Sequence, residues 1–458
     1  MKNFFPFILF SVLIFVACRK NEIIDYNPNL KLQFSTDSIL FDTVFTDKGS
    51  TSRSLKVFNY NKNSIIISDI KLLGGSQSAF KININGVATD NLTNIKVQGN
   101  DSIYVFVKAF IDPTNSDSPF LVEDQLTFSL NGRTDTIPLI AYGQNAVYLK
   151  DAYFTQNTSL SKNKPYLFVN DAVVGANTTL NIEAGSRLYF HKNAKLYVAG
   201  SLQANGTLQD SITISSDRME RIYSDEAGQW GGVHLLRTSF DNQINYTTLK
   251  NAIVGIRVDS LSNNSNPKLL LTNSIIKNHE VAGVLGYTAS ITGINNLMYN
   301  CGQFLVIGLY GGDYRFYQNT LANYNYNFPR RSPSVYFSDN LEDQSASSKA
   351  LQAIFVNNII YGSLIREVDF NQIGTNPYTV NFEDNLIRSD VQTLGNSNIY
   401  NQDPLFLDSR KEIYQLPNNS PAMGKGQDLS GNSYFNIYLM KDLVGKARTF
   451  PSTLGCYQ

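Results

Sequence analysis

Acidic and basic side chains gather between residues 313 and 343, where they could perform acid–base chemistry. Asp313 and Arg315 stand two residues apart, and the Arg330-Arg331 pair, Asp339, Glu342 and Asp343 follow. Hydrolysis of a glycosidic bond requires two carboxyl groups on one face, about 5–10 Å apart. The chain has no Asp-Asp pair and its other carboxylates are scattered, so we assign no catalytic residue. The alternative for this segment is a solvated loop whose charges serve solubility.

Aromatic residues are dense around the same segment, namely Tyr310, Tyr314, Phe316, Tyr317, Tyr324, Tyr326, Phe328, Tyr336 and Phe337. Alternate residues such as Tyr314 and Phe316 share one face of a strand. Directed inward they would stack in a core, and directed outward they would form a flat platform for sugars or for another protein. Both directions stay open at this point. The candidate binding surface consists of Tyr314, Arg315, Tyr324, Tyr326, Arg330 and Arg331.

The histidines and cysteines do not indicate a metal site. His191, His234 and His279 lack the short spacing of zinc ligands, and no CxxC pair is present. We therefore expect neither a metal nor a cofactor. His279 and the adjacent Glu280 are expected to form a surface pair, and Trp230, beside two glycines, to be a packing residue.

The first twenty residues have the pattern of an export signal. One early cation precedes an apolar run from Phe4 to Ala17, which is too short for a comfortable membrane span. The string Phe15-Val16-Ala17-Cys18 resembles a bacterial lipobox, in which the cysteine becomes the acylated first residue. The resemblance implies a lipid anchor at Cys18, because each buried methylene of an acyl chain contributes about 0.8 kcal/mol. An ordinary signal peptide that contains a cysteine is the alternative.

The composition indicates a folded, exported β-protein. The 458 residues carry 38 basic and 38 acidic side chains, and the charged fraction of 17% lies below the roughly 25% of an ordinary soluble domain. Such a chain is neither a basic nucleic-acid binder nor a disordered segment. About one residue in nine is Asn, and Tyr and Phe are frequent, which favours strands joined by many turns. Only Cys301 and Cys456 follow Cys18, so no disulfide framework holds the chain together, and whether these two pair stays open.

Residues 31–148 predict a β-sandwich. About seven short runs alternate apolar and polar residues, as in Ile103-Tyr104-Val105-Phe106-Val107, and Asn- or Gly-rich turns separate them. The stretch resembles the immunoglobulin-like domains that precede larger modules in bacterial surface proteins. Tripeptides such as Asp37-Ser38-Ile39 look like O-glycosylation sites of exported proteins in Bacteroidota-type bacteria. The alternative is that Asp-Ser/Thr only turns the chain into a strand.

From about residue 149 the strands become very short, and six strings repeat. They end at Asn251, Asn278, Asn300, Asn323, Gly362 and Ser389, at intervals of 27, 22, 23, 39 and 27 residues. An apolar column consists of Leu249, Ile276, Met298, Leu321, Ile360 and Ile387, and two positions earlier stand Thr247, Ser274, Asn296, Asn319, Asn358 and Asn385. Intervals of 22 to 27 residues fit one rung of a parallel β-helix with three strands, stacked about 4.8 Å apart. We expect the apolar column to face the core, and the Asn column to form amide hydrogen bonds at a corner.

These repeats resemble the right-handed parallel β-helix proteins of the pectin-lyase-like superfamily. The strings Asp403-Pro404-Leu405-Phe406 and Ser420-Pro421-Ala422 are similar to the closing region of β-helix surface proteins, which implies that they finish the last rungs. The predicted order is a lipoprotein signal peptide (1–18), a linker (19–30), an immunoglobulin-like β-sandwich (31–148), a right-handed parallel β-helix (149–402) and its closing region (403–458).

The resemblance leaves three roles open. Enzymes of the superfamily cut acidic polysaccharides, either by β-elimination with an Arg or Lys base or by hydrolysis with a cluster of Asp residues, and we find neither set of residues. We therefore expect a non-catalytic, lipid-anchored protein on the outer-membrane surface whose β-helix binds glycans or docks to other envelope proteins. The alternatives are a polysaccharide lyase or hydrolase, and a structural subunit of an outer-membrane protein complex. The expected partners are the membrane and a polysaccharide or an outer-membrane protein, not nucleic acid.

Overall fold

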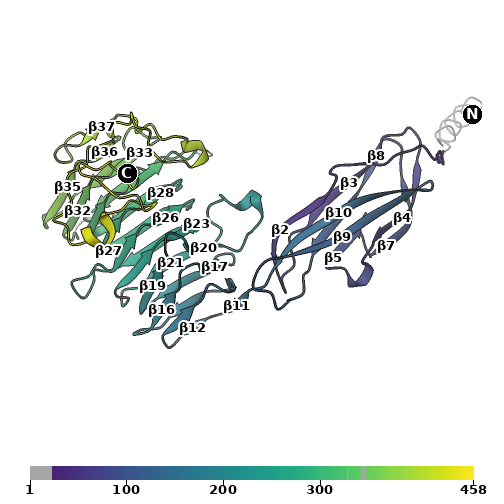
Figure 1. Ribbon diagram of the computed structural model, residues 1–458, viewed down its shortest axis with the longest axis horizontal. Helices are drawn as coiled ribbons and strands as arrows, with labels where there is room; N and C mark the ends of the chain where they lie inside the picture. Colours follow the sequence, from purple (N-terminus) through teal and green to yellow (C-terminus); the bar gives the residue numbers. More distant parts are fainter. Residues whose placement is uncertain (1–22, 327–328, 342–346) are drawn as a thin grey trace, which may run out of the picture. The chain divides into compact units, whose positions relative to one another are not determined.

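The computed structural model describes residues 23–326, 329–341 and 347–458, which divide into two units between Asn145 and Ala146 (Figure 1). The predicted signal peptide with Cys18, and also Phe328, Glu342 and Asp343, lie outside the described residues. Within the described part of the chain, no helix has the length and apolar character needed to cross a bilayer.

The first unit is the predicted β-sandwich, with two five-stranded sheets. Sheet one contains β1 (Gln33–Phe34), β3 (Arg53–Asn59), β8 (Asp101–Ala109), β5 (Phe80–Ile84) and β6 (Val87–Ala88), in that order. Sheet two contains β2 (Ile39–Phe45), β10 (Arg133–Gln144), β9 (Phe120–Leu130), β4 (Ile65–Leu72) and β7 (Asn91–Val97). A short 3₁₀ helix, η1 (Gly75–Gln77), precedes β5. The alternation seen in the sequence is confirmed in β8, where Ile103, Val105 and Val107 are buried and Tyr104 and Phe106 are exposed.

The second unit is the predicted parallel β-helix, and all of its strand pairs within the two large sheets are parallel. Each rung contributes to three faces. Face one contains β12 (Tyr153–Phe154), β15 (Ala172–Val174), β18 (Lys195–Val198), β21 (Gly232–Leu235), β24 (Val254–Asp259), β31 (Val335–Ser338) and β34 (Val368–Asn371). Face two contains β13 (Thr158–Leu160), β16 (Thr179–Ile182), β19 (Ser201–Asn205), β22 (Asn242–Asn245), β25 (Leu269–Thr272), β32 (Leu351–Val356) and β35 (Tyr378–Glu383).

Two long strands, β27 (Ala282–Ile294) and β29 (Phe304–Tyr317), bend at the corner and belong to faces one and two together. Face three contains β11 (Val147–Leu149), β14 (Tyr166–Phe168), β17 (Arg187–Phe190), β20 (Ile212–Ser216), β23 (Thr247–Lys250), β26 (Ile275–Lys277), β28 (Leu297–Tyr299), β30 (Thr320–Asn323), β33 (Ile359–Gly362), β36 (Leu386–Ile387) and β37 (Ile399–Tyr400). Short helical turns are η2 (Arg221–Tyr223), η3 (Ser409–Lys411) and η4 (Phe435–Leu439).

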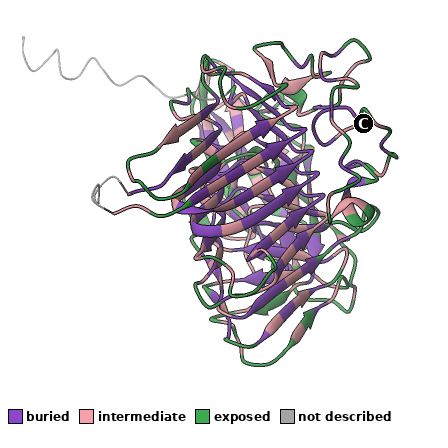
Figure 2. Ribbon diagram, turned by 90° about the vertical axis from the view of Figure 1, so that its left-hand side faces the viewer, coloured by how far each residue is buried: buried purple, intermediate pink, exposed green. Residues whose placement is uncertain are grey.

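The apolar column is confirmed as the interior of face three. The strand register joins Leu249 to Ile276, Ile276 to Met298, and so on through Leu321 and Ile360 to Ile387. All six side chains are fully buried. Figure 2 shows buried residues throughout the stacked strands and exposed residues mainly in the connections. Because burial of one Leu or Ile contributes roughly 1.5–3 kcal/mol, the column is a main source of stability.

The Asn column is confirmed as a hydrogen-bond ladder at the corner between faces two and three. The backbone N–H and the amide Nδ2 of Asn319 both donate to Oδ1 of Asn358, over 2.8 and 2.9 Å. Asn296 donates to Asn319, and Asn358 to Asn385, in the same way. The residue before each of these positions, such as Asn295 with φ 56°, adopts the left-handed conformation that Asn tolerates well.

Residues 403–458 do not finish the last rungs as expected but cover this corner, which we call the covered corner. Nδ2 of Asn295 donates to the carbonyls of Tyr438 and Lys441, over 2.6 and 2.7 Å. The N–H of Gly455 donates to the carbonyl of Asn357, over 2.8 Å. The left-handed corner residues direct polar groups outward, and the C-terminal segment supplies their partners. In Figure 1 this segment is the yellow chain beside β27, β28 and β33.

The 39-residue interval proves to be two separate excursions, because β31 lies within it and pairs with β29 and β34. Val335 and Phe337 of this strand face the core, where both are fully buried. The chain therefore leaves the β-helix twice: the first excursion lies between β30 and β31, after face three, and the second lies between β31 and β32, between faces one and two.

Three smaller expectations have clear outcomes. Trp230 is a packing residue, as expected: it is fully buried and stacks on Phe190 with ring centroids 4.5 Å apart. The expectation for His279 was wrong, because this side chain is fully buried and desolvation lowers its pKa to about 3. Its Nδ1 accepts from the N–H of Ala252 over 3.1 Å, so the histidine fixes the backbone of the preceding rung. Cys301 and Cys456 are both buried and unpaired.

Candidate functional site

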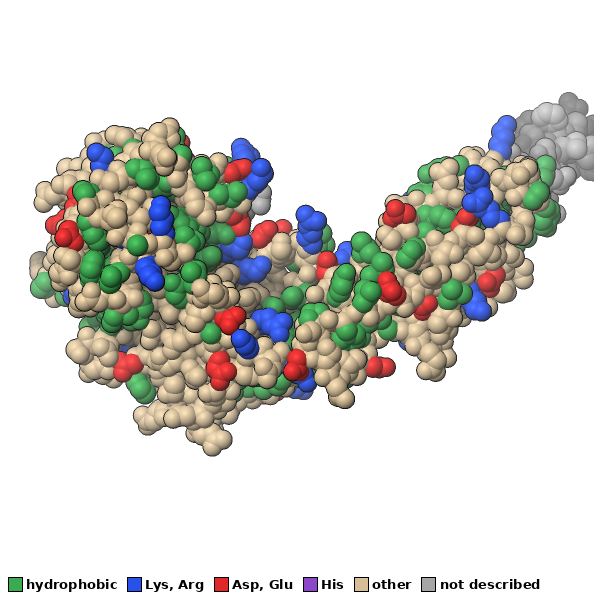
Figure 3. All heavy atoms as spheres, in the orientation of Figure 1, with side chains coloured by type: hydrophobic (Ala, Val, Ile, Leu, Met, Phe, Trp, Pro, Cys, Tyr) green, Lys and Arg blue, Asp and Glu red, His purple; other side chains and the backbone are tan. Residues whose placement is uncertain are grey.

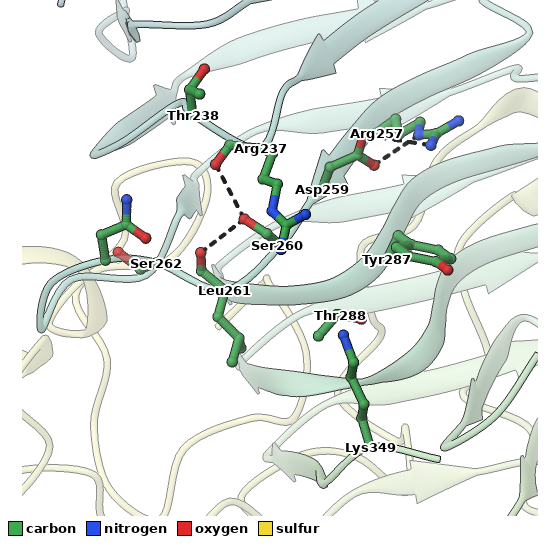
Figure 4. Close-up of a pocket in the computed structure, with 11 residues that line it drawn as sticks. Arg237, Thr238, Arg257, Asp259, Ser260, Leu261, Ser262, Tyr287, Thr288 and Lys349 are labelled. Atoms are coloured by element: carbon green, nitrogen blue, oxygen red, sulfur yellow. Dashed lines mark hydrogen bonds and ion pairs between the residues drawn. The ribbon is translucent and has the colours of Figure 1, made fainter. Parts of the chain in front are cut away.

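The corner between faces one and two, which we call the open corner, carries two hollows separated by the loop 260–268. The first hollow, of about 700 Å³, is lined by Arg237, Thr238, Arg257, Asp259, Ser260, Leu261, Ser262, Asn263, Tyr287, Thr288 and Lys349 (Figure 4). The second, of about 400 Å³, is lined by Leu261, Ser262, Asn264, Ser265, Asn266, Pro267, Ser290, Ile291, Thr292, Asp313, Arg315, Ser433 and Tyr434. Leu261 and Ser262 line both, so the two hollows lie side by side.

The strands of face one position the polar side chains of the first hollow. Arg257 and Asp259 stand two residues apart on β24 and therefore point to the same, outer side of the sheet. Register places His234 beside Arg257 and Asp259 beside Tyr287. Figure 4 shows Arg257, Asp259 and Tyr287 on neighbouring strands, with Lys349 reaching toward Thr288 from the second excursion.

Among the described residues that line the first hollow, Asp259 is the only carboxylate, and it is held as an ion. Nε2 of His234 lies 2.7 Å from one carboxylate oxygen, and Nε of Arg257 donates to the other over 2.9 Å. Partial burial raises the pKa of Asp259, but the hydrogen bonds from His234 and Arg257 outweigh burial and leave the pKa below its usual value. A general acid for sugar hydrolysis needs a raised pKa, so Asp259 is unsuited to that role.

The loop 260–268 is fixed by a buried ammonium group. Nζ of Lys268 donates to the carbonyl of Arg237 over 2.7 Å, to the carbonyl of Asp259 over 3.0 Å and to Oγ of Ser260 over 2.6 Å. Oγ of Ser290 accepts from the N–H of Lys268 over 3.0 Å. Desolvation lowers the pKa of Lys268 to about 8. The loop that divides the hollows is therefore held in one conformation before any ligand arrives.

Cations are in excess around the first hollow. Arg237, Arg257 and Lys349 line it together with one carboxylate, and all three side chains are exposed. Nζ of Lys349 lies 4.6 Å from the ring centroid of Tyr310, and this ring packs near that of Tyr287. The face seen in Figure 3 has few charged side chains, with both signs interspersed, so an excess of one sign in a single hollow is a local feature.

The second hollow repeats the same arrangement in a smaller form. Nε and Nη2 of Arg315 donate to the two carboxylate oxygens of Asp313 over 2.9 and 3.0 Å, and Nη2 also donates to Gln352 over 3.2 Å. Asp313 is the only carboxylate among the lining residues that the structure describes here. In each hollow, the one carboxylate among the described lining residues is paired with an arginine.

The candidate binding surface predicted from the sequence is brought together only in part: Tyr324, Tyr326 and Arg330 line one hollow, whereas Tyr314 and Arg315 lie elsewhere. Tyr314 is fully buried. Its ring occupies space that side chains at Gly286 and Gly308 would otherwise fill, and it contacts Phe337 with ring centroids 4.7 Å apart. Arg330 is also buried: its Nη2 lies 2.5 and 2.7 Å from the carboxylate oxygens of Glu367. Placing Tyr314 on the surface was wrong, whereas Arg330 lines a hollow with its guanidinium group buried in the ion pair.

The other predicted residues lie at different sites. Arg315 lines the second hollow, whereas Tyr324, Tyr326 and Arg330 line a separate hollow of about 430 Å³ on the first excursion. The Tyr326 ring stacks on the Tyr324 ring, and the guanidinium of Arg410 lies 4.6 Å from the Tyr326 ring centroid. Tyr326 therefore already has partners within the chain. Arg331 is exposed beside them.

Of the possible catalytic cleft around Asp313, the described carboxylate Asp339 does not join Asp313, and Glu342 and Asp343 lie outside the described residues. Asp339 is buried, and its carboxylate accepts from the N–H groups of Ile373 and Gly374 over 2.9 and 2.8 Å, so it fixes a turn. The structure describes no group of three or more His, Cys, Asp or Glu residues that could hold a metal ion.

Sequence reasoning missed the residues of the first hollow. The spacing of two residues between Arg257 and Asp259 indicates that they share one face of a strand, and alignment of the rungs places Asp259 next to Tyr287. Arg237 and Lys349 lie in connections without a repeating pattern, so no spacing in the sequence could have joined them to this site.

No family model matches this chain, and no curated protein matches it. Solved structures similar to it include a family 123 glycoside hydrolase from Clostridium perfringens, with 7% identity, a TM-score of 0.19, and coverage of 26% of this chain and 30% of that chain. Two structures of the catalytic domain of a family 87 α-1,3-glucanase in complex with nigerose share 9% and 10% identity, each with a TM-score of 0.20 and coverage of 74% of this chain and 81% of that chain. The present chain thus spans about 30% of the first of these structures. With such TM-scores, the strand pairing and not these likenesses carries the assignment of the fold.

Proposed function

We propose that the protein binds an anionic glycan in the two hollows of the open corner and does not cleave it. The observation that carries this proposal is the ionic pairing of each carboxylate. Asp259 is paired with Arg257, and Asp313 with Arg315, so neither hollow offers the free pair of carboxyl groups that hydrolysis requires. Arg237 and Lys349 remain to receive negative groups of a ligand.

The geometry suits a sugar chain. The first hollow offers the partly exposed ring of Tyr287 beside planar guanidinium groups, and Arg groups recognise carboxylates and sulfates through paired hydrogen bonds. Because Lys268 holds the dividing loop in place, little conformational entropy is lost on binding.

The test is calorimetric titration of the full chain with anionic and neutral polysaccharides, alongside measurement of new reducing ends and of unsaturated products. We expect saturable binding of an anionic polymer, loss of that binding in Arg237→Ala/Lys349→Ala, and no product. Arg331→Ala is the matched control, because Arg331 is exposed but does not line either hollow. Release of products by the wild type, abolished by Asp259→Asn, would instead establish a lyase or hydrolase.

We further propose that the protein is a lipoprotein of a Bacteroidota-type bacterium, held on the outer-membrane surface by acylated Cys18. The lipobox-like string before this cysteine supports the proposal. Fractionation of cells should find the wild type in outer membranes and Cys18→Ala in the soluble fraction. Surface digestion of intact cells by a protease separates an outward-facing protein from a periplasmic one.

Docking to another envelope protein is a second candidate role, supported by an apolar patch on sheet two of the sandwich. Leu40, Leu121 and Tyr142 are each at least half exposed, and they lie on the adjacent strands β2, β9 and β10. Crosslinking in intact cells, compared with a Leu40→Ser/Leu121→Ser variant, tests this role. A crosslinked partner that persists in the variant would remove the patch from consideration.

A further inference from the structure

The outer side of sheet one of the sandwich carries an aromatic stripe. Tyr104 and Phe106 on β8 are both 43% exposed, and their rings lie 5.8 Å apart with an interplanar angle of 11°. Phe58 on β3 and the following Tyr60 form a second near-parallel pair, 5.1 Å apart. Isolated exposed aromatics are common, but here two near-parallel pairs begin on the adjacent strands β3 and β8, and Lys56 lies over one ring of each pair.

Lysines lie along this stripe without acidic neighbours. Nζ of Lys56 lies 5.1 Å from the Tyr104 ring centroid and 5.5 Å from that of Phe58. The outward positions of β3, β5 and β8 that the structure describes are Ser54, Lys56, Phe58, Lys81, Asn83, Ser102, Tyr104, Phe106 and Lys108, none of them Asp or Glu. The outer side of these strands is therefore positively charged.

Two of these lysines directly oppose each other across the sheet. Register pairs Lys81 with Lys108 in the antiparallel β5 and β8. Like charges at such positions repel. The carbonyls of Ser76 and Ser78, which each accept from Nζ of Lys81 over 3.3 Å, offset part of this repulsion, and a bound anion would compensate the positive charge of both lysines. Both line a hollow of about 470 Å³ with Ser52, Ile82, Asn83 and Phe106.

We propose that this side of the sandwich is a second glycan-binding site, specific for a polysaccharide that carries sulfate or carboxylate groups. Tyr104 and Phe106 would pack against the apolar faces of successive sugar rings, while Lys81 and Lys108 would bind an anionic substituent in the hollow. The hollow between the two lysines favours a discrete substituent over a flat membrane surface. This site is formed by the first unit alone and does not depend on the hollows of the β-helix.

The experiment uses the full chain with Arg237→Ala/Arg257→Ala/Lys349→Ala, which removes the three cations that line the first hollow of the open corner. Binding of dextran sulfate is compared with binding of neutral dextran, which has the same backbone without charge. We expect dextran sulfate to bind and neutral dextran not to bind. Within this background, Lys81→Ser/Lys108→Ser and, separately, Tyr104→Ala/Phe106→Ala should each weaken binding about tenfold or more, equivalent to about 1.4 kcal/mol.

Matched controls lie on sheet two of the same sandwich. Lys71→Ser and Tyr142→Ala replace exposed residues of the same types and should change affinity less than about twofold. Unchanged thermal unfolding of the exposed-site variants shows that each is folded, and the single variant Lys108→Gln provides a milder substitution.

Two results would overturn the proposal. If only the lysine variant loses binding and Tyr104→Ala/Phe106→Ala does not, the interaction is unspecific charge attraction. If the background protein binds phosphatidylcholine vesicles that contain phosphatidylglycerol but not dextran sulfate, the surface contacts a membrane. Because the open corner is already disabled in this background, either result leaves the first proposal unaffected.

Discussion

The covered corner and the open corner of the β-helix occur on the same rungs but are built in opposite ways. At the covered corner, Asn296, Asn319 and Asn358 repeat the same hydrogen bonds from rung to rung, and the C-terminal segment satisfies their outer neighbours. At the open corner, connections differ in length and sequence between rungs, and charged side chains line two hollows. Repetition therefore supplies stability on one side, while the connections on the other side vary in length and sequence.

The largest effect is expected from breaking the ladder. Asn319→Ala removes amide bonds to Gly293, Tyr317 and Asn358, and leaves Asn296 without its acceptor. With about 1 kcal/mol net for each bond, we expect the free energy of unfolding to fall by roughly 3–5 kcal/mol. Thermal unfolding monitored by circular dichroism measures the loss. Asn264→Ala at the open corner, an exposed position, is the control and should lower stability by less than about 1 kcal/mol.

The second effect concerns binding and should appear only at the open corner. Arg257→Ala and Lys349→Ala should each weaken binding of the anionic glycan about tenfold, because each removes one cation from the first hollow. Their thermal unfolding should match the wild type. If Asn319→Ala, measured well below its unfolding temperature, loses as much affinity as these variants, the two corners do not have separate roles.

Lys268 links stability to pH at the open corner. Desolvation lowers the pKa of its ammonium from 10.5 to about 8. Between these values the unfolded chain binds a proton that the native chain has released, so the contribution of this group to stability rises with pH. We expect the free energy of unfolding of the wild type minus that of Lys268→Met to increase from pH 8 to pH 10. A constant or decreasing difference contradicts the assigned environment of Lys268.

The smallest effect is expected where the C-terminal segment meets face three. Nζ of Lys277 and the hydroxyl of Tyr299 donate to Glu412 over 2.6 and 2.8 Å, near the surface. Glu412→Gln should lower the free energy of unfolding by less than about 1 kcal/mol, since partly exposed ion pairs contribute little. Limited proteolysis should nevertheless cut the C-terminal segment sooner in this variant than in the wild type.

The covered corner could be predicted from the sequence, because each stacked rung needs a buried apolar side chain and a hydrogen-bonding side chain at equivalent positions. Leu321 and Asn319 recur in register with their equivalents, so spacing alone located the core and the ladder. The open corner could not be predicted in this way. Its residues come from connections of unequal length, and outward positions such as Arg257 face solvent, where no packing requirement imposes a pattern. Aligning only the repeated strings of face three also failed to reveal β31, which divides the long interval into two excursions.

Hydrogen exchange measured by mass spectrometry, with and without a saturating anionic glycan, tests the central claim most directly. The account predicts that the glycan slows exchange in peptides covering residues 257–268 and 285–290 at the open corner. Peptides covering residues 293–298 and 317–321 at the covered corner should exchange equally in both samples. Saturable binding that protects the covered corner, or that leaves residues 257–268 unchanged, would contradict the assignment of recognition to the open corner.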